Sequence, residues 1–183
     1  MRGSEAGSPD PNGAGDPVRA AFEEYVAARR PALLRTAYLL VGGDADAEDL
    51  VQLALVKAMP HWRRIGHDPE GYVRTVLARE ATNRWRRRRW REVSTDALPE
   101  TDRTGDPTSD HAGAVTDRVA LQRALMALSP RQRAVVVLRY FDGLTERETA
   151  EALGIGLGTV KSHGRDALGR LRELLPAEVT AAL

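Results

Sequence analysis

The chain has 183 residues, of which 42% are hydrophobic and only 5% are aromatic. It contains no cysteine, which excludes disulfides, thiolate zinc sites and cysteine nucleophiles. No stretch approaches the ~18 apolar residues of a membrane span, and the first residues lack the apolar segment of a secretory signal. We therefore expect a cytoplasmic protein with no membrane insertion.

The net charge of +1 conceals a segregation of charge along the chain. Residues 21–93 carry 14 basic and 10 acidic side chains (net +4), residues 94–114 carry one and five (net −4), and residues 115–175 carry 10 and seven (net +3). Two basic blocks around an acidic one indicate two polyanion-binding modules and a linker. Two ordinary solvated helical surfaces would give the same charges, so the motifs must decide.

The first half of the chain predicts a tail and three helices. Residues 1–17 are rich in Gly, Pro, Asp and Ser and are expected to be disordered. A helical spacing of apolar residues runs over 18–40, interrupted by Pro31. A second helix begins at Asp44 or Asp46 and ends at Pro60, and a third runs from near Pro69 to about Val93. The expected apolar face of the second helix is Leu50, Leu53, Ala54 and Val56, and that of the third is Tyr72, Val73, Val76 and Leu77.

The second half predicts a linker at 94–114 and four helices. The helices are expected at 115–126, at 130–140 behind the N-cap Ser129, at about 146–153 behind the capping-box residue Thr145, and at 158–175. No segment alternates with a period of two, and no repeat is present. The prediction is an all-α protein of two small helical domains, 18–93 and 115–175, joined by a flexible acidic linker, with tails at 1–17 and 176–183.

The first candidate site is a run of seven arginines between Arg79 and Arg91, opposed only by Glu80. Such a run surrounds a helix with guanidinium groups, which pair with phosphates, and the interleaved tryptophans can stack on bases. We favour nucleic acid as the ligand. The alternatives are a solvated helix end whose tryptophans belong to the core, and a membrane-surface helix, for which the apolar face is thin.

The second candidate site is the helix-turn-helix pattern of residues 145–163. Gly154 allows a left-handed turn between two helices, and Ile155 and Val160 are expected to fill their shared core. The second helix would present five side chains to a major groove, namely Thr159, Lys161, Ser162, His163 and Arg165. The alternative is a helical hairpin without a role in DNA binding.

Enzyme chemistry finds little support in this sequence. The four histidines are scattered, and no phosphate-binding loop or nucleophile elbow is present. Asp44, Asp46, Glu48 and Asp49 form an acidic cluster that could attract Mg²⁺, but acids at a helix start more often complement the helix dipole. We expect no enzymatic activity, no cofactor and no metal.

These motifs, taken together, resemble a known family. Residues 47–52 and 72–76, running into the arginine-rich helix, resemble region two of bacterial sigma factors. Residues 128–133, and 158–162 through to Arg172, look like region four. With only a short linker between, the chain resembles the extracytoplasmic-function (ECF) group of the sigma-70 family over about residues 20–175. The arginine-rich ending of region two is similar to an actinobacterial branch.

The resemblance implies the promoter-specificity subunit of RNA polymerase, with core RNA polymerase and promoter DNA as partners and an anti-sigma factor as a further one. Core polymerase would be bound by Glu48, Asp49, Leu50 and Gln52. The minus-10 element would be bound by Arg79, Asn83, Arg84, Arg86 and Arg87, and the minus-35 element by the five side chains of the last helix. Gly156 replaces a common serine at the start of that helix, which weakens its cap. A free-standing helix-turn-helix repressor or activator, and a protein-binding adaptor, remain the alternatives.

Overall fold

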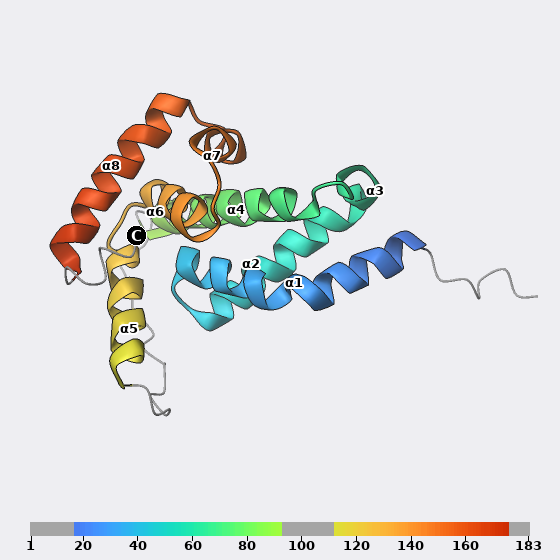
Figure 1. Cartoon of the computed structure of the whole chain (residues 1–183), viewed down its shortest axis with the longest axis horizontal. Helices are drawn as coiled ribbons and strands as arrows, with labels where there is room; N and C mark the ends of the chain where they lie inside the picture. The colour runs from blue at the N-terminus through green and yellow to red at the C-terminus, as the bar shows by residue number, and fades with distance from the viewer. Residues whose placement is uncertain (1–16, 93–111, 176–183) are drawn as a thin grey trace, which may run out of the picture.

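The computed structural model describes residues 17–92 and 112–175, with side chains described for 17–85 and 118–175. The described residues contain helices and turns and no strand (Figure 1). The all-α prediction is confirmed. The elements are α1 (Pro17–Val41), α2 (Asp44–Ala58), the 3₁₀ turn η1 (Met59–His61), α3 (Trp62–Ile65), α4 (Pro69–Glu92), α5 (Ala112–Met126), α6 (Pro130–Val136), the π-helical turn η2 (Val137–Phe141), α7 (Glu146–Leu153) and α8 (Leu157–Leu174).

Most helix ends follow from local chemistry. Ser129 and Thr145 each cap a helix through a complete capping box, with Gln132 and Glu148 as the reciprocal partners. Gly154 has a φ of +64°, which a residue with a Cβ adopts only at a cost. These three predictions are confirmed. The predicted interruption at Pro31 is wrong, because α1 continues through it to Val41.

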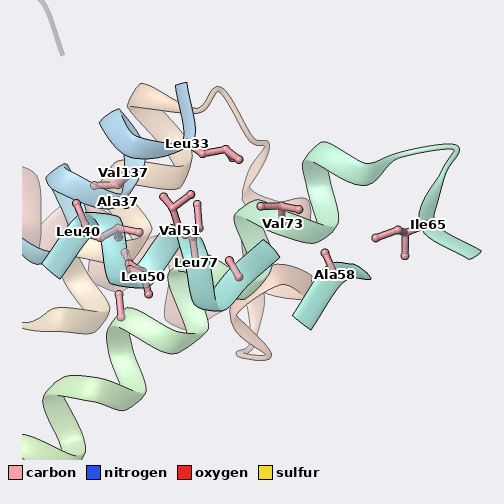
Figure 2. Packing of buried hydrophobic residues seen from close by; sticks show 14 of the residues in the cluster. Leu33, Ala37, Leu40, Leu50, Val51, Ala58, Ile65, Val73, Leu77 and Val137 are labelled. Atoms are coloured by element: carbon pink, nitrogen blue, oxygen red, sulfur yellow. The ribbon is translucent and has the colours of Figure 1, made fainter. Parts of the chain in front are cut away.

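The first half of the chain folds around α1, α2 and α4, whose buried side chains form one core (Figure 2). Trp62 seals its end, with its ring edge-on to Phe22 at 4.9 Å and tilted against Tyr25 at 5.0 Å. Glu70 at the start of α4 accepts hydrogen bonds from Arg29 and Tyr25 of α1. This network ties α4 to α1 and so fixes the direction in which the arginine-rich helix runs.

The buried face of α2 differs from the prediction. The buried residues are Ala47, Leu50, Val51, Ala54 and Ala58, which follow the spacing of one helical stripe. Leu53 and Val56 were expected in this face, but they are 40% and 62% exposed. The helix carries apolar residues on two faces, and only one of them is covered by α1 and α4.

The centre of the molecule is α6 with its continuation η2. Five consecutive residues, Ala134–Leu138, are at most 1% exposed. Successive helical residues point about 100° apart, so five in a row can be buried only if neighbours surround the helix. One side packs on α8 and α5, and the other on α1 and α4, which lie next to α6 in Figure 1. The two halves of the chain are therefore packed against each other.

Among the helices of the described residues, none is both long and apolar enough to cross a bilayer.

Candidate polymerase-docking and nucleic-acid surfaces

The predicted polymerase-docking residues lie on α2, and three of the four reach the surface. Glu48, Asp49 and Gln52 are exposed, whereas Leu50 is 0% exposed. Leu50 belongs to the core and supports the helix from inside, because it offers no surface to a partner. Glu48 is ion-paired with Arg30 of α1.

An apolar groove, which was not predicted from the sequence, lies beside these residues. It has a volume of about 380 Å³ and is lined by Phe22, Val26, Arg30, Glu48, Val51, Gln52, Leu55, Val56 and Met59. Val56 and Met59 are the most exposed apolar residues of this lining, at 62% and 51%. Leu53 of the same helix is 40% exposed. The signal in the sequence was the position of Leu53 and Val56 off the stripe of Leu50 and Ala54.

The predicted minus-10 residues divide into two groups on α4. Arg84 pairs with Asp46 at 3.0 Å and with Asp49 at 3.3 Å, so it joins the acidic start of α2 to α4. Arg79 donates to main-chain oxygens of α7, and Asn83 lines the adjoining cleft. The side chains of Arg86 and Arg87 lie outside the described residues.

Two further expectations about this part of the chain can be compared with the structure. Trp85 is 44% exposed rather than part of the core, which does not fit the alternative of a helix end with buried tryptophans. The acidic cluster at the start of α2 is engaged by Arg84. Across residues 17–85 and 118–175, no three His, Asp or Glu side chains come together to hold a metal ion.

The predicted minus-35 residues gather on the first turns of α8. Thr159, Lys161 and Arg165 are exposed, and Ser162 and His163 are half-buried. Val160 between them is 2% exposed and anchors the helix, as predicted, whereas Ile155 is only partly buried. The N-cap of α8 is Gly156, which has no side chain to cap the helix.

A basic hollow of about 350 Å³ adjoins this face of α8. Lys161 and Arg165 line it together with Arg139 of η2 and Arg172 near the end of α8, against the single acid Glu146. Glu146 lies 3.7 Å from the Lys161 ammonium. Arg139 and Arg172 were not selected from the sequence, since arginine is common throughout this chain. Four cations against one carboxylate give the hollow a positive potential that suits an anionic ligand.

Electrostatics around Glu70 hold α1 and α4 together behind these surfaces. The Arg29 guanidinium donates at 2.8 and 2.7 Å, Arg74 lies 2.9 Å away, and the Tyr25 hydroxyl donates at 3.1 Å. The hydrogen bonds from Arg29 hold the pKa of Glu70 below its ordinary value, although burial opposes this. Glu70 is therefore charged at neutral pH. Burial and the adjacent Glu70 carboxylate raise the pKa of Tyr25.

Comparison with known proteins identifies the two halves. The family model described as Sigma-70 region 2 matches residues 25–91, and the one described as Sigma-70, region 4 matches residues 118–171. The chain is 45% identical to the RNA polymerase sigma-E factor of Streptomyces coelicolor over 85% of this chain and 86% of that protein. It is 35% identical to the ECF RNA polymerase sigma factor SigL of Mycobacterium tuberculosis, covering 85% and 86% respectively. These relatives confirm the likeness to an actinobacterial branch.

A solved structure agrees with the fold. The sigma factor RpoE of Bartonella quintana, solved in complex with the anti-sigma factor NepR, matches with a TM-score of 0.69 and 28% identity, over 84% of this chain and 95% of that one. The order of the two regions along the chain, the helix-turn-helix and the relatives all indicate the same family. The chain therefore belongs to the ECF group of the sigma-70 family of RNA polymerase sigma factors.

Proposed function

We propose that this promoter-specificity subunit docks core RNA polymerase through α2, holds the minus-10 element along α4 and reads the minus-35 element with the first turns of α8. Residues 18–93 and 115–175 act as the two modules, and 94–114 as their linker. The observation that carries the proposal is the presence of both sigma regions in one chain, each with exposed polar residues where its partner is expected. The subunit performs no chemistry and needs no cofactor, and it acts where the polymerase acts, in the cytoplasm.

The proposed polymerase site combines a polar edge with an apolar groove. Glu48, Asp49 and Gln52 form the edge, and Val56 and Met59 are the most exposed apolar residues beside it. An exposed apolar groove next to specific polar groups is typical of a protein-binding surface. We commit to core polymerase as the occupant because this groove continues the surface of the docking residues.

Val56→Glu tests the docking site more cleanly than a charge reversal at Asp49, because Asp49 also pairs with Arg84 on the proposed DNA face. Val56 is 62% exposed in the free chain, so the variant should keep its fold and helicity. Buried valine contributes about 1.5 kcal/mol, and a desolvated carboxylate adds a further cost, so affinity for core polymerase should fall at least about tenfold.

The matched control is Val119→Glu on α5, which places the same charge at a valine of 44% exposure outside the docking surface. Both variants are titrated against labelled core polymerase, and helicity is followed by circular dichroism. Val119→Glu should bind as the unmodified chain does. Unchanged affinity of Val56→Glu would mean that the polymerase does not use this groove.

Promoter recognition separates this proposal from a free-standing repressor. Each basic module is small, and the acidic linker opposes binding of DNA by the chain alone. We expect footprints on promoter DNA only when core polymerase is present. Tight, sequence-specific protection by the free chain that core polymerase leaves unchanged would favour the repressor.

An anti-sigma factor is the third proposed partner. The support is the Bartonella relative, which was solved in complex with such an inhibitor. Competition between core polymerase and a candidate inhibitor for this chain would test it. An inhibitor of this kind should lower the fraction of chain bound to core polymerase as its concentration rises.

A further inference from the structure

A small cleft lies where α4 meets α6 and the turn that follows α7 (Figure 1). It has a volume of about 260 Å³ and takes its walls from three separate parts of the chain. The lining contains two arginines and neither aspartate nor glutamate, its members being Arg79, Thr82, Asn83, Arg131, Leu153, Gly154 and Ile155. The cleft therefore brings two positive charges together without an opposing charge.

The other arginines on the described part of α4 have carboxylate partners. Arg74 lies 2.9 Å from Glu70, and Arg84 lies 3.0 Å from Asp46. The acid nearest to the cleft along the chain, Glu151, lines a separate cavity. Two guanidinium groups that share a small cleft repel each other, and a bound anion would remove that cost.

The main chain holds Arg79 in place at this cleft. Its guanidinium donates to the Ala152 carbonyl at 2.5 Å and to the Glu151 carbonyl at 2.9 Å. A guanidinium carries five N–H donors, and these two bonds leave three for a ligand. Because the two carbonyls already fix the plane of the group, little side-chain entropy is lost when an anion binds. Arg79 is therefore preorganised as one half of an anion site.

Arg131 supplies the second charge from the first turn of α6. It is exposed, and among the described side chains and main chain nothing pairs with its guanidinium. Asn83 adds an amide that donates hydrogen bonds. Thr82 is not counted as a donor, because its hydroxyl donates to the Ala78 carbonyl at 2.6 Å. Two guanidinium groups and one amide form a donor set that suits the oxygens of a phosphate group.

We infer that this cleft binds the phosphate group of a small anionic metabolite between Arg79 and Arg131. A phosphate presents three acceptor oxygens in different directions, which suits donors on separate walls better than a planar carboxylate does. The volume lies below the ~300–1,000 Å³ of pockets that enclose a drug-sized ligand. The cleft would therefore enclose the phosphate and leave the rest of a larger molecule outside, beside Leu153 and Ile155.

A small molecule fits this cleft better than a nucleic-acid strand. The walls come from α4, α6 and the turn after α7, so a long strand would reach only the rim. A bound phosphate would occupy Arg79 and Asn83, which are also proposed to meet the minus-10 element. Competition with promoter DNA is the only part of this inference that rests on the proposed function.

Binding of pyrophosphate to the free, full-length chain tests the site. Arg131→Ala removes one of the two guanidinium groups, and the variant should fold because Arg131 is exposed. The matched control is Arg147→Ala, which removes an exposed arginine that lines a separate cavity. The two variants have the same net charge. Equilibrium dialysis with radiolabelled pyrophosphate at constant ionic strength measures binding, and circular dichroism checks helicity.

The unmodified chain and Arg147→Ala should bind pyrophosphate saturably, with a Kd of about 1 mM or below. Arg131→Ala should bind at least about fivefold more weakly. Arg131→Lys should recover only part of the loss, because an ammonium lacks the planar fork of arginine. The inference is overturned if Arg131→Ala binds as the unmodified chain does, if Arg147→Ala loses as much, or if binding is not saturable up to about 10 mM.

A labelled single-stranded oligonucleotide of about 12 nucleotides distinguishes nucleic acid from a small molecule. Its fluorescence anisotropy is measured with the unmodified chain and with both variants. If Arg131→Ala weakens binding of the oligonucleotide but not of pyrophosphate, the cleft belongs to a nucleic-acid surface and the inference is wrong. None of these assays contains polymerase, so their failure would not affect the proposed function, and a failure of run-off transcription would not affect the anion site.

Discussion

Replacing Arg133 by methionine should destabilise the chain more than any surface arginine. Arg133 is 9% exposed and donates to four main-chain carbonyls, at distances of 2.8 Å for Leu40, 2.9 Å for Leu125, 3.2 Å for Leu128 and 3.3 Å for Met126. Burial lowers its pKa to about 10, so the guanidinium remains protonated at neutral pH. One side chain thus links the end of α1 to the turn between α5 and α6.

The magnitude follows from the groups left behind. Methionine fills the space of the Arg133 side chain but donates no hydrogen bond, and a buried carbonyl without a donor costs about 1–3 kcal/mol. Leu125 keeps a second donor, the Leu128 amide at 3.1 Å, so three carbonyls carry the loss. Water that enters this space will satisfy some of the carbonyls, so the free energy of unfolding should fall by about 3–5 kcal/mol. That is a large part of the stability of an ordinary domain.

Urea unfolding at pH 7, followed by circular dichroism, measures this loss. The control is Arg131→Met, since Arg131 lies in the same helix and is exposed, and its effect should stay within about 0.5 kcal/mol. Arg133→Lys should recover only part of the difference, because an ammonium cannot reach carbonyls in the planar fork of arginine. A loss below about 1 kcal/mol for Arg133→Met would refute the reasoning.

Three further outcomes are expected. Glu70→Gln should lower the free energy of unfolding by about 1–3 kcal/mol at pH 7. The difference from the unmodified chain should narrow as the pH falls below about 4.5, because the pKa of Glu70 is lowered in the folded state and its stabilisation is lost when the carboxylate is protonated. Urea titrations at pH 7 and 3.5 would show no such convergence if the ion pairs contribute nothing. Thr145→Ala removes the cap of α7 and should cost about 1 kcal/mol in the same assay. Arg165→Ala should relax the preferred minus-35 sequence in a randomised-promoter selection, with a cost of about 1–3 kcal/mol at one base position, whereas Arg170→Ala should not. An unchanged preference would mean that Arg165 contacts only the DNA backbone. In that case the slope of log binding constant against log salt concentration should fall in magnitude by about one unit.

Several features of this protein could be predicted from the sequence because short-range chemistry decides them. A capping box needs only Ser129 and Gln132 three residues apart, and a left-handed turn needs only a glycine such as Gly154. The same applies to the exposed face of the recognition helix, since Val160 marks the buried side and the polar residues around it mark the other. Such features depend on neighbours in the chain, which the sequence displays directly.

The tertiary structure decided what long-range contacts determine. Apolar spacing indicated that α2 is amphipathic, but only packing against α1 and α4 shows that Leu50 is buried and Val56 is exposed. An arginine reads the same in sequence whether it faces solvent, phosphate or protein. The structure separates Arg133, bound to main-chain carbonyls, from Arg84, bound to carboxylates, and from Arg79, bound to the end of α7. The reason is that burial and pairing depend on residues up to about 100 positions away, whose approach is set by the fold as a whole.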